Sequence, residues 1–217
     1  MARLGMNAFH RGVWLACIAL AGAALPSVGG THDVRQGQSL VQLLAYARPG
    51  DTVRVTAGVY EGNLRLTRRV VLLGEGMPVL RGEGNGSVLS IEADSCVVRG
   101  FVIERSGSML VNEDAGILIK SDANIIEGNV LRDVLFGIYL LQSHDCQIVN
   151  NSIRGRRELD LGERGAGIHV WNSLRNRFIG NVICDARDGF YIQNANHSWI
   201  ERNECFDVRY GLHYMYA

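Results

Sequence analysis

A repeat of about 22 residues organises the second half of this 217-residue chain. Its first marker is a glycine that opens a short apolar run, at Gly116, Gly137, Gly167, Gly189 and Gly211. Its second marker is an asparagine, at Asn129, Asn151, Asn181 and Asn203. Both markers place eight additional residues in the unit between Gly137 and Gly167. A repeat this short argues against helical repeats, which need about 33 residues or more per unit.

Each unit contains three short apolar runs separated by polar turns, as at 137–140, 147–149 and 152–154. Runs of this length suit strands and are too brief for helices. Three strands per unit predict an all-β fold, a right-handed parallel β-helix whose coils bury their inward side chains by stacking on their neighbours. We expect the recurring asparagines to tolerate left-handed turn geometry and to satisfy buried turn groups with their stacked amides.

The residues before the repeat predict an N-terminal capping helix and the first strands. Residues 39–47 have helical apolar spacing, with Ser39 as a candidate N-cap and Pro49-Gly50 ending the helix. Strands are expected at 50–55 and 58–60. The helix is expected to cover the open end of the stack, which otherwise exposes core and strand edges.

The two ends of the chain carry separate expectations. At the C-terminal end, residues 211–217 begin a new coil without a visible cap, so we expect the β-helix domain, residues 31–217, to be truncated there or covered by another molecule. Residues 1–30 have a basic start, an apolar stretch at 13–25 and small residues at 26–30, which predict a cleaved secretory signal and a periplasmic protein. A retained membrane anchor is the alternative, although the stretch is short for a bilayer.

Charge and cysteine content narrow the kinds of partner and of cysteine chemistry that the chain can have. The 22 basic and 22 acidic residues balance, so no net field favours nucleic acid as a partner. The mature chain has four cysteines, at Cys96, Cys146, Cys184 and Cys205. Their spacings match neither a metal-ligand nor a redox motif, which leaves buried unpaired thiols and disulfides as the two alternatives.

A candidate binding face follows from the alternation of side chains along the first strand of each coil. If Ile138 and Leu140 point inward, Tyr139 points outward, and the same rule applies to every coil. One outward column is Leu118, Tyr139, His169, Tyr191 and His213; its neighbour is Lys120, Leu141, Trp171, Gln193 and Met215. Contiguous aromatic surface favours a binding site over scattered surface hydrophobes. The predicted face comprises Tyr139, His169, Trp171, Tyr191, Gln193, His213 and Met215.

The longer unit places a charged, glycine-bounded loop at 155–165, directly before the strand of His169. Such a loop either walls a groove beside the face, docks a partner, or is a solvated insertion without a role. Polysaccharide-cleaving enzymes need paired carboxylates. Asp185, Asp188 and Asp207 lie near turns, but no pair repeats across adjacent strands, so turn capping explains them and an enzyme is not the favoured interpretation.

A copper site is a further hypothesis. His213 and Met215 are predicted to point outward from one strand, and an imidazole with a thioether suits Cu(I) better than a hard cation. Two ligands leave the site incomplete, so ordinary surface residues are the favoured alternative. No cofactor is otherwise required.

Specific runs of the sequence resemble known families. The segment around Pro49-Gly50-Asp51 resembles the cap and first coil of pectin-lyase-like β-helices. The runs 167–173 (GIHVWNS), 188–193 (DGFYIQ) and 209–216 (RYGLHYMY) resemble the NosD family of periplasmic β-helix accessory proteins. The last run is the most specific, since the shorter Gly-Ile-Tyr-Leu pattern would fit any carbohydrate-binding type of β-helix.

The resemblance implies a non-enzymatic factor in the maturation of nitrous oxide reductase. Its implied partners are the reductase apoprotein and an ABC-type ATPase and permease that supply sulfur for the copper-sulfide centre, which would hold the protein peripherally at the inner membrane. Copper binding is often attached to the family. The alternative from another class is a carbohydrate-binding or polysaccharide-modifying β-helix that uses the same face.

Overall fold

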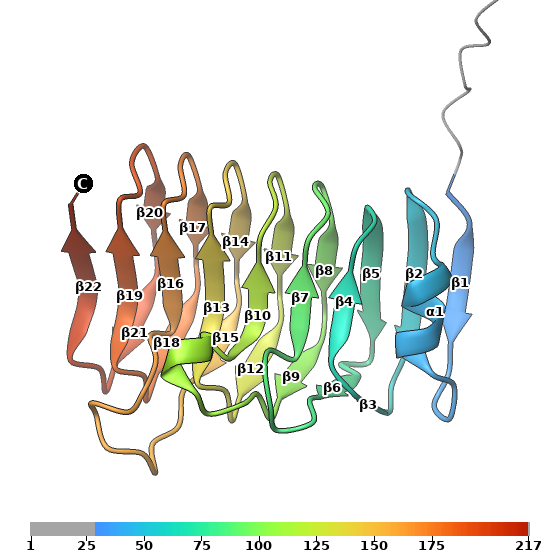
Figure 1. The fold of residues 1–217 in the computed structure, drawn as a ribbon, viewed down its shortest axis with the longest axis horizontal. Coiled ribbons are helices and arrows are strands. Elements are labelled where there is room, and N and C mark those ends of the chain that lie inside the picture. The colour runs from blue at the N-terminus through green and yellow to red at the C-terminus, as the bar shows by residue number, and fades with distance from the viewer. Residues whose placement is uncertain (1–28, 217) are drawn as a thin grey trace, which may run out of the picture.

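The computed structural model describes residues 29–216, which form a parallel β-helix of about eight coils (Figure 1). Its strands build three parallel sheets, and the crossover from each strand to the next strand of its own sheet is right-handed, as such connections almost always are. The predicted fold class is therefore confirmed. Figure 1 shows the strands of one sheet side by side, from the N-terminal end on the right to the C-terminal end on the left.

Sheet A contains β1 (Thr31–Val34), β2 (Asp51–Thr56), β5 (Val70–Glu75), β8 (Val97–Arg99), β11 (Ile125–Glu127), β14 (Gln147–Val149), β17 (Arg177–Ile179) and β20 (Trp199–Glu201). Sheet B contains β3 (Val59–Glu61), β6 (Val79–Arg81), β9 (Val102–Glu104), β12 (Val130–Arg132), β15 (Ser152–Arg154), β18 (Val182–Cys184) and β21 (Glu204–Phe206). Sheet C contains β4 (Leu64–Leu66), β7 (Leu89–Ile91), β10 (Ala115–Ile119), β13 (Phe136–Leu141), β16 (Ile168–Trp171), β19 (Asp188–Gln193) and β22 (Tyr210–Met215).

Apolar side chains fill the interior of the coils. In sheet C, Ile117, Ile138, Ile168 and Phe190 are register partners on successive strands, and all are buried. The glycine that opens each coil lies at the start of the same strands. A Cβ atom at Gly137 would collide with the backbone oxygen of Gly167, so the marker glycines allow neighbouring coils to approach closely.

The marker asparagines form a buried ladder between sheets A and B. The side-chain amide of Asn129 donates to Asn151 at 3.0 Å, Asn151 donates to Asn181 at 3.0 Å, and Asn181 donates to Asn203 at 2.9 Å. The predicted amide stacking is confirmed, but the expected left-handed geometry is wrong for these residues. The preceding residue adopts it instead, at Gly128, Asn150, Gly180 and Arg202.

The N-terminal helix agrees closely with its prediction. Helix α1 (Leu40–Tyr46) begins after Ser39, whose hydroxyl accepts from the backbone N–H of Gln42 at 3.2 Å, and it buries Leu40 and Leu44 against the first coils. Strand β1 precedes the helix and pairs with β2, an element that the sequence did not predict. The predicted signal at 1–30 lies almost wholly outside the described residues. No helix within 29–216 has the length and apolar character needed to cross a bilayer.

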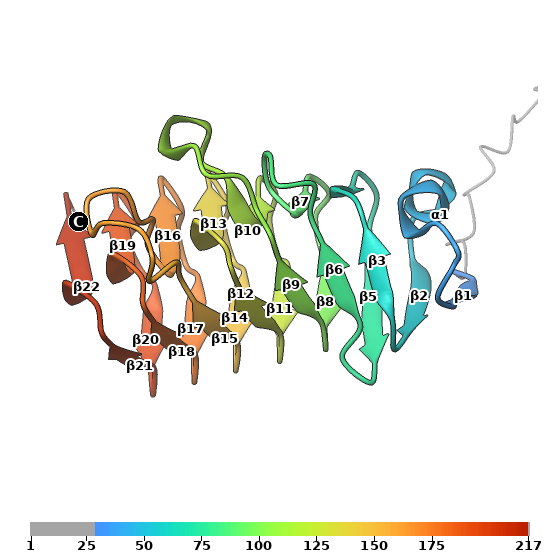
Figure 2. The ribbon, with the colours of Figure 1, turned by 90° about the horizontal axis from the view of Figure 1, so that it is seen from below.

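Two insertions leave the coils at the corner between sheets B and C. One connects β9 to β10 and contains the 3₁₀ helix η1 (Leu110–Asn112); the other is the predicted loop at 155–165, between β15 and β16. Figure 2 shows the η1 segment, in green, standing above β10 and β13, with the 155–165 loop in orange beside it. The first insertion was not predicted, because its coil carries no marker glycine.

Candidate functional site

The outward column predicted on sheet C is confirmed by the strand register. Tyr139 pairs with His169, His169 with Tyr191, and Tyr191 with His213. The ring centroids of these successive pairs lie 4.3, 4.7 and 4.8 Å apart. The neighbouring column is also in register, with Leu141, Trp171, Gln193 and Met215 on successive strands. The seven predicted face residues therefore lie side by side on the outward side of sheet C.

The expected exposure of this surface is wrong at its N-terminal half. Tyr139 is only 1% exposed and Leu118 only 8%, because the two insertions fold back over the outside of the sheet. These residues join a second apolar cluster outside the coils, together with Ala115, Leu135, Phe136 and Ala166. The hydroxyl of Tyr139 donates to Glu113 beside η1 at 2.7 Å, and burial, followed by that carboxylate, raises the pKa of the phenol. Tyr139 thus packs beneath the two insertions and is not accessible to a binding partner.

Arg156 joins the two insertions. It lies at the start of the 155–165 loop and is 8% exposed. Its guanidinium donates to the backbone oxygens of Ser106 at 2.7 Å and Gly107 at 3.2 Å in the η1 segment, and to the carboxylate of Asp133 at 3.0 Å. Of the alternatives left open for the 155–165 loop, a wall beside the face agrees with its position, and a buried arginine holds it against the other insertion.

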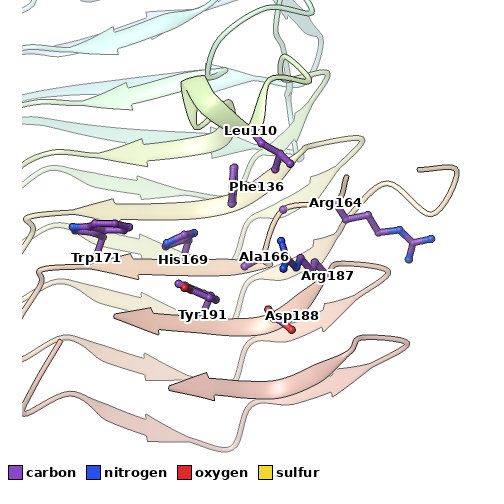
Figure 3. Close-up of a pocket in the computed structure, with 10 residues that line it drawn as sticks. Leu110, Phe136, Arg164, Ala166, His169, Trp171, Arg187, Asp188 and Tyr191 are labelled. Carbon is purple, nitrogen blue, oxygen red and sulfur yellow. The ribbon is translucent and has the colours of Figure 1, made fainter. Parts of the chain in front are cut away.

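Between the insertions and the aromatic column lies a cavity of about 270 Å³ (Figure 3). Its lining comprises Leu110, Phe136, Arg164, Gly165, Ala166, His169, Trp171, Arg187, Asp188 and Tyr191. Figure 3 shows Trp171 at one end of the row, His169 and Tyr191 in the middle, and the charged side chains at the other end. The walls are thus mostly aromatic and apolar, and the charged groups are confined to one end.

His169 forms an uncharged part of the wall. Its ring is packed against Tyr139, Tyr191 and Phe136, and burial lowers the pKa of the imidazole to about 4. Both ring nitrogens are shielded from solvent and have no hydrogen-bond partner. Such unpaired buried groups are uncommon and destabilise a fold, so the imidazole is held in the wall by its ring packing and not by hydrogen bonds.

The charged end of the cavity carries an excess of positive charge. Asp188 is 1% exposed, and its carboxylate accepts two hydrogen bonds from Arg209, at 2.8 and 3.0 Å, which neutralise it. Arg164 donates to the backbone oxygens of Leu159 and Arg157. Within residues 29–216, no side-chain hydrogen bond or ion pair engages the guanidinium of Arg187.

The remaining predicted residues occupy the C-terminal edge of the face. Nδ1 of His213 lies 3.3 Å from Oδ2 of Asp188, and Met215 lies beside Tyr191 on the next strand. In the described part of the chain, no group of three or more His, Cys, Asp or Glu side chains is arranged to hold a metal ion. Asp185 and Asp207 adopt left-handed turn geometry, in agreement with the turn interpretation.

The cysteines lie away from this site. Cys96, Cys146, Cys184 and Cys205 are all unpaired, and the first three are buried. Burial raises the pKa of the Cys146 thiol to about 11, so it stays protonated at neutral pH. These thiols pack as small apolar side chains.

Sequence reasoning missed four residues of the cavity, namely Leu110, Phe136, Ala166 and Arg187, and gave Asp188 only a turn role. It reached Arg164 and Gly165 only as members of the 155–165 loop. Phe136 lies one residue before the marker Gly137, and Arg187 lies two residues before the marker Gly189. The repeat alone could therefore have placed both at the corner between sheets B and C. Leu110 belongs to an insertion without a repeat marker, and nothing in the sequence indicated that it would fold over the face.

Comparisons with known proteins place the chain among β-helices. The model of the family described as right handed beta helix region matches residues 92–217. Two relatives are each named "Probable ABC transporter binding protein NosD". The one from Pseudomonas aeruginosa is 35% identical over 137 residues, 62% of this chain and 32% of its own length. The one from Stutzerimonas stutzeri is 34% identical over 138 residues, 63% of this chain and 32% of its own length. The chain thus spans about a third of the length of these curated relatives.

Among solved structures, the alginate lyase from Paenibacillus sp. superposes with a TM-score of 0.67. The match covers 79% of this chain and 65% of the lyase, at 18% sequence identity. At that identity the likeness concerns the fold alone.

Proposed function

Because the chain belongs to the right-handed β-helix family, we propose that it uses this scaffold as a non-enzymatic accessory protein of an ABC transporter. In its specific form, the proposal is that the exported protein assists assembly of the copper-sulfide centre of nitrous oxide reductase in the periplasm. The transporter's ATPase and permease would supply the sulfur species. The aromatic face would engage the reductase apoprotein or the permease, and no resident cofactor is required.

The observation that carries the proposal is the sequence identity of about 35% to two relatives whose printed name is an ABC transporter binding protein. The character of the cavity supports it. Its aromatic walls suit a protein contact, because buried aromatic and arginine side chains are enriched where protein partners bind.

An enzymatic role finds less support in the same cavity. Glycoside cleavage requires two carboxyl groups on opposite sides of the bond. Among the described residues, Asp188 is the one carboxylate in the lining, and Arg209 already occupies both of its oxygens. The carbohydrate alternative is tested directly by a panel of uronate polymers, on which binding or product release would favour it over the accessory role.

The decisive experiment is complementation of a denitrifying strain that lacks its own NosD. We expect the full-length gene to restore nitrous oxide reduction and the absorption bands of the copper-sulfide centre in the purified reductase. Replacing Trp171 and His213 with alanine, alone and with His169→Ala, is expected to reduce both readouts. Trp199, a 58% exposed tryptophan on sheet A, provides the matched control as Trp199→Ala. Unchanged maturation in the Trp171 and His213 variants would contradict the proposed face.

A further inference from the structure

The cavity beside His169 has the features of a socket for one side chain of a protein partner. We propose that it binds a polypeptide segment that places an aromatic or large aliphatic side chain against Trp171 and Tyr191 and an adjacent carboxylate on Arg187. This inference deepens the proposed function by naming the chemistry that the face recognises. The cavity volume of about 270 Å³ suits a single large side chain and is small for an extended ligand.

The apolar part of the socket favours a side chain over a sugar. Phe136, Trp171 and Tyr191 line it, and His169 between them is neutral. The imidazole nitrogens are covered by their neighbours and offer no hydrogen bond to an occupant. A sugar ring would leave several hydroxyl groups without partners in such walls, which is costly, whereas an apolar side chain would lose nothing.

The charged end favours an anionic group on the occupant. Arg164 and Arg187 both line it, while Asp188, the one carboxylate that residues 29–216 place there, is paired with Arg209. The Arg187 guanidinium has no partner among the described residues, so its donors are available. A carboxylate is the natural partner, because arginine binds it through two parallel hydrogen bonds.

The rim of the socket favours a polypeptide as the bearer of both groups. Met109, Leu110 and Val111 at the tip of the η1 segment are 54%, 39% and 82% exposed, and Leu161 on the other insertion is 44% exposed. Apolar side chains on two loops that flank one cavity form a patch that would pack against the remainder of a bound segment. The segment would therefore be held by a central anchor and an apolar surround.

The test is a calorimetric or NMR titration of the purified chain with four blocked tetrapeptides. They combine Phe or Ala at the second position with Glu or Gln at the third. We expect the Phe–Glu peptide to bind most tightly, with a Kd at least about tenfold below that of Ala–Glu and about fivefold below that of Phe–Gln. Equal binding of all four peptides would overturn the inference.

Two variants locate the contacts. Arg187→Gln should abolish the preference for Glu over Gln and leave the preference for Phe. Val111→Ser, at the rim and outside the cavity lining, should weaken the binding of all four peptides by a similar factor. Arg177→Gln, on β17 of sheet A, is the matched control and should change nothing. A Glu preference that survives Arg187→Gln, or binding of oligouronates in place of the peptides, would refute the socket.

Failure of the socket and failure of the proposed function are distinguishable. If the peptides show no preference while the complementation above succeeds and depends on Trp171, the accessory role stands and the socket is wrong. If the peptide preferences are observed but maturation does not depend on the chain, the socket stands and its partner lies in another system.

Discussion

The hydroxyl of Tyr191 donates a hydrogen bond to the sulfur of Met215 at 2.9 Å, across the junction of β19 and β22. The sulfur is the softer of the two atoms in the copper hypothesis, and any Cu(I) bound there would have to displace this hydroxyl. The copper hypothesis therefore predicts opposite changes in Cu(I) affinity when Met215 and Tyr191 are replaced.

In a Cu(I) titration under reducing conditions, we expect Met215→Leu to lower the affinity and Tyr191→Phe to raise it. The leucine removes a soft ligand, while the phenylalanine frees the sulfur without disturbing the aromatic column. His213→Ala should resemble Met215→Leu. Identical affinities in the wild type and Met215→Leu would exclude this pair as ligands.

Replacing Arg156 with alanine is expected to release both insertions from the face. The variant loses several hydrogen bonds of a buried guanidinium, which we expect to lower the free energy of unfolding by about 2 kcal/mol. Limited proteolysis should then cut within 105–114 and 155–165 before the coils. Arg157→Ala is the control, because that side chain is 80% exposed. Equal protease resistance in the two variants would show that Arg156 does not hold the loops.

The asparagine ladder is expected to contribute strongly to stability at Asn151. Its side-chain oxygen accepts from both the backbone and side-chain nitrogens of Asn129, and its own amide donates to Ile126 and Asn181. Asn151→Ala should cost about 3 kcal/mol, since it leaves buried backbone groups unpaired. Asn150→Gly should be nearly neutral, because Asn150 already adopts a φ of 53°. Chemical denaturation measures the free energy of unfolding of both variants. Similar values would show that the asparagine ladder does not contribute to the stability of the fold.

The free energy of unfolding should decrease as the pH falls below about 6.5, and part of this decrease should depend on His169. Burial holds the pKa of its imidazole at about 4, against about 6.5 in an unfolded chain, so the unfolded state binds the additional proton. The neutral ring's contribution is complete above about pH 6.5 and is lost as the pH falls toward 4, amounting to about 3 kcal/mol. In the His169→Phe variant this part of the pH dependence should disappear between pH 7 and 4.5. An unchanged slope would assign the acid sensitivity to other groups.

The repeat markers predicted the arrangement of the face better than its exposure. Stacked coils bring residues one repeat apart into register, so the pairing of Tyr139 with His169 and of Trp171 with Gln193 followed from counting. Markers of a coil report which way a side chain points, but they contain no information on what covers it. The burial of Tyr139 depends on loops whose path is set by contacts such as that of Arg156, and these join residues about 50 positions apart.

Two further differences have local causes. Strand β1 escaped prediction because only Val34 of its four residues is buried, so it has almost no apolar pattern. The left-handed turn residues lie one position before the ladder asparagines, since the ladder needs the amide turned inward while the bend needs a permissive backbone. Two neighbouring residues thus divide between them the tasks that were assigned to one.

Both insertions leave the solenoid at one corner, between β9 and β10 and between β15 and β16, while the strands on either side keep their register. The loops that cover the face and the strands that carry it consequently lie in separate stretches of the chain. Sequence divergence confined to 105–114 and 155–165 would therefore reshape the opening of the cavity in descendants of this protein, while Trp171, Arg187 and Tyr191 keep their places on an unaltered solenoid.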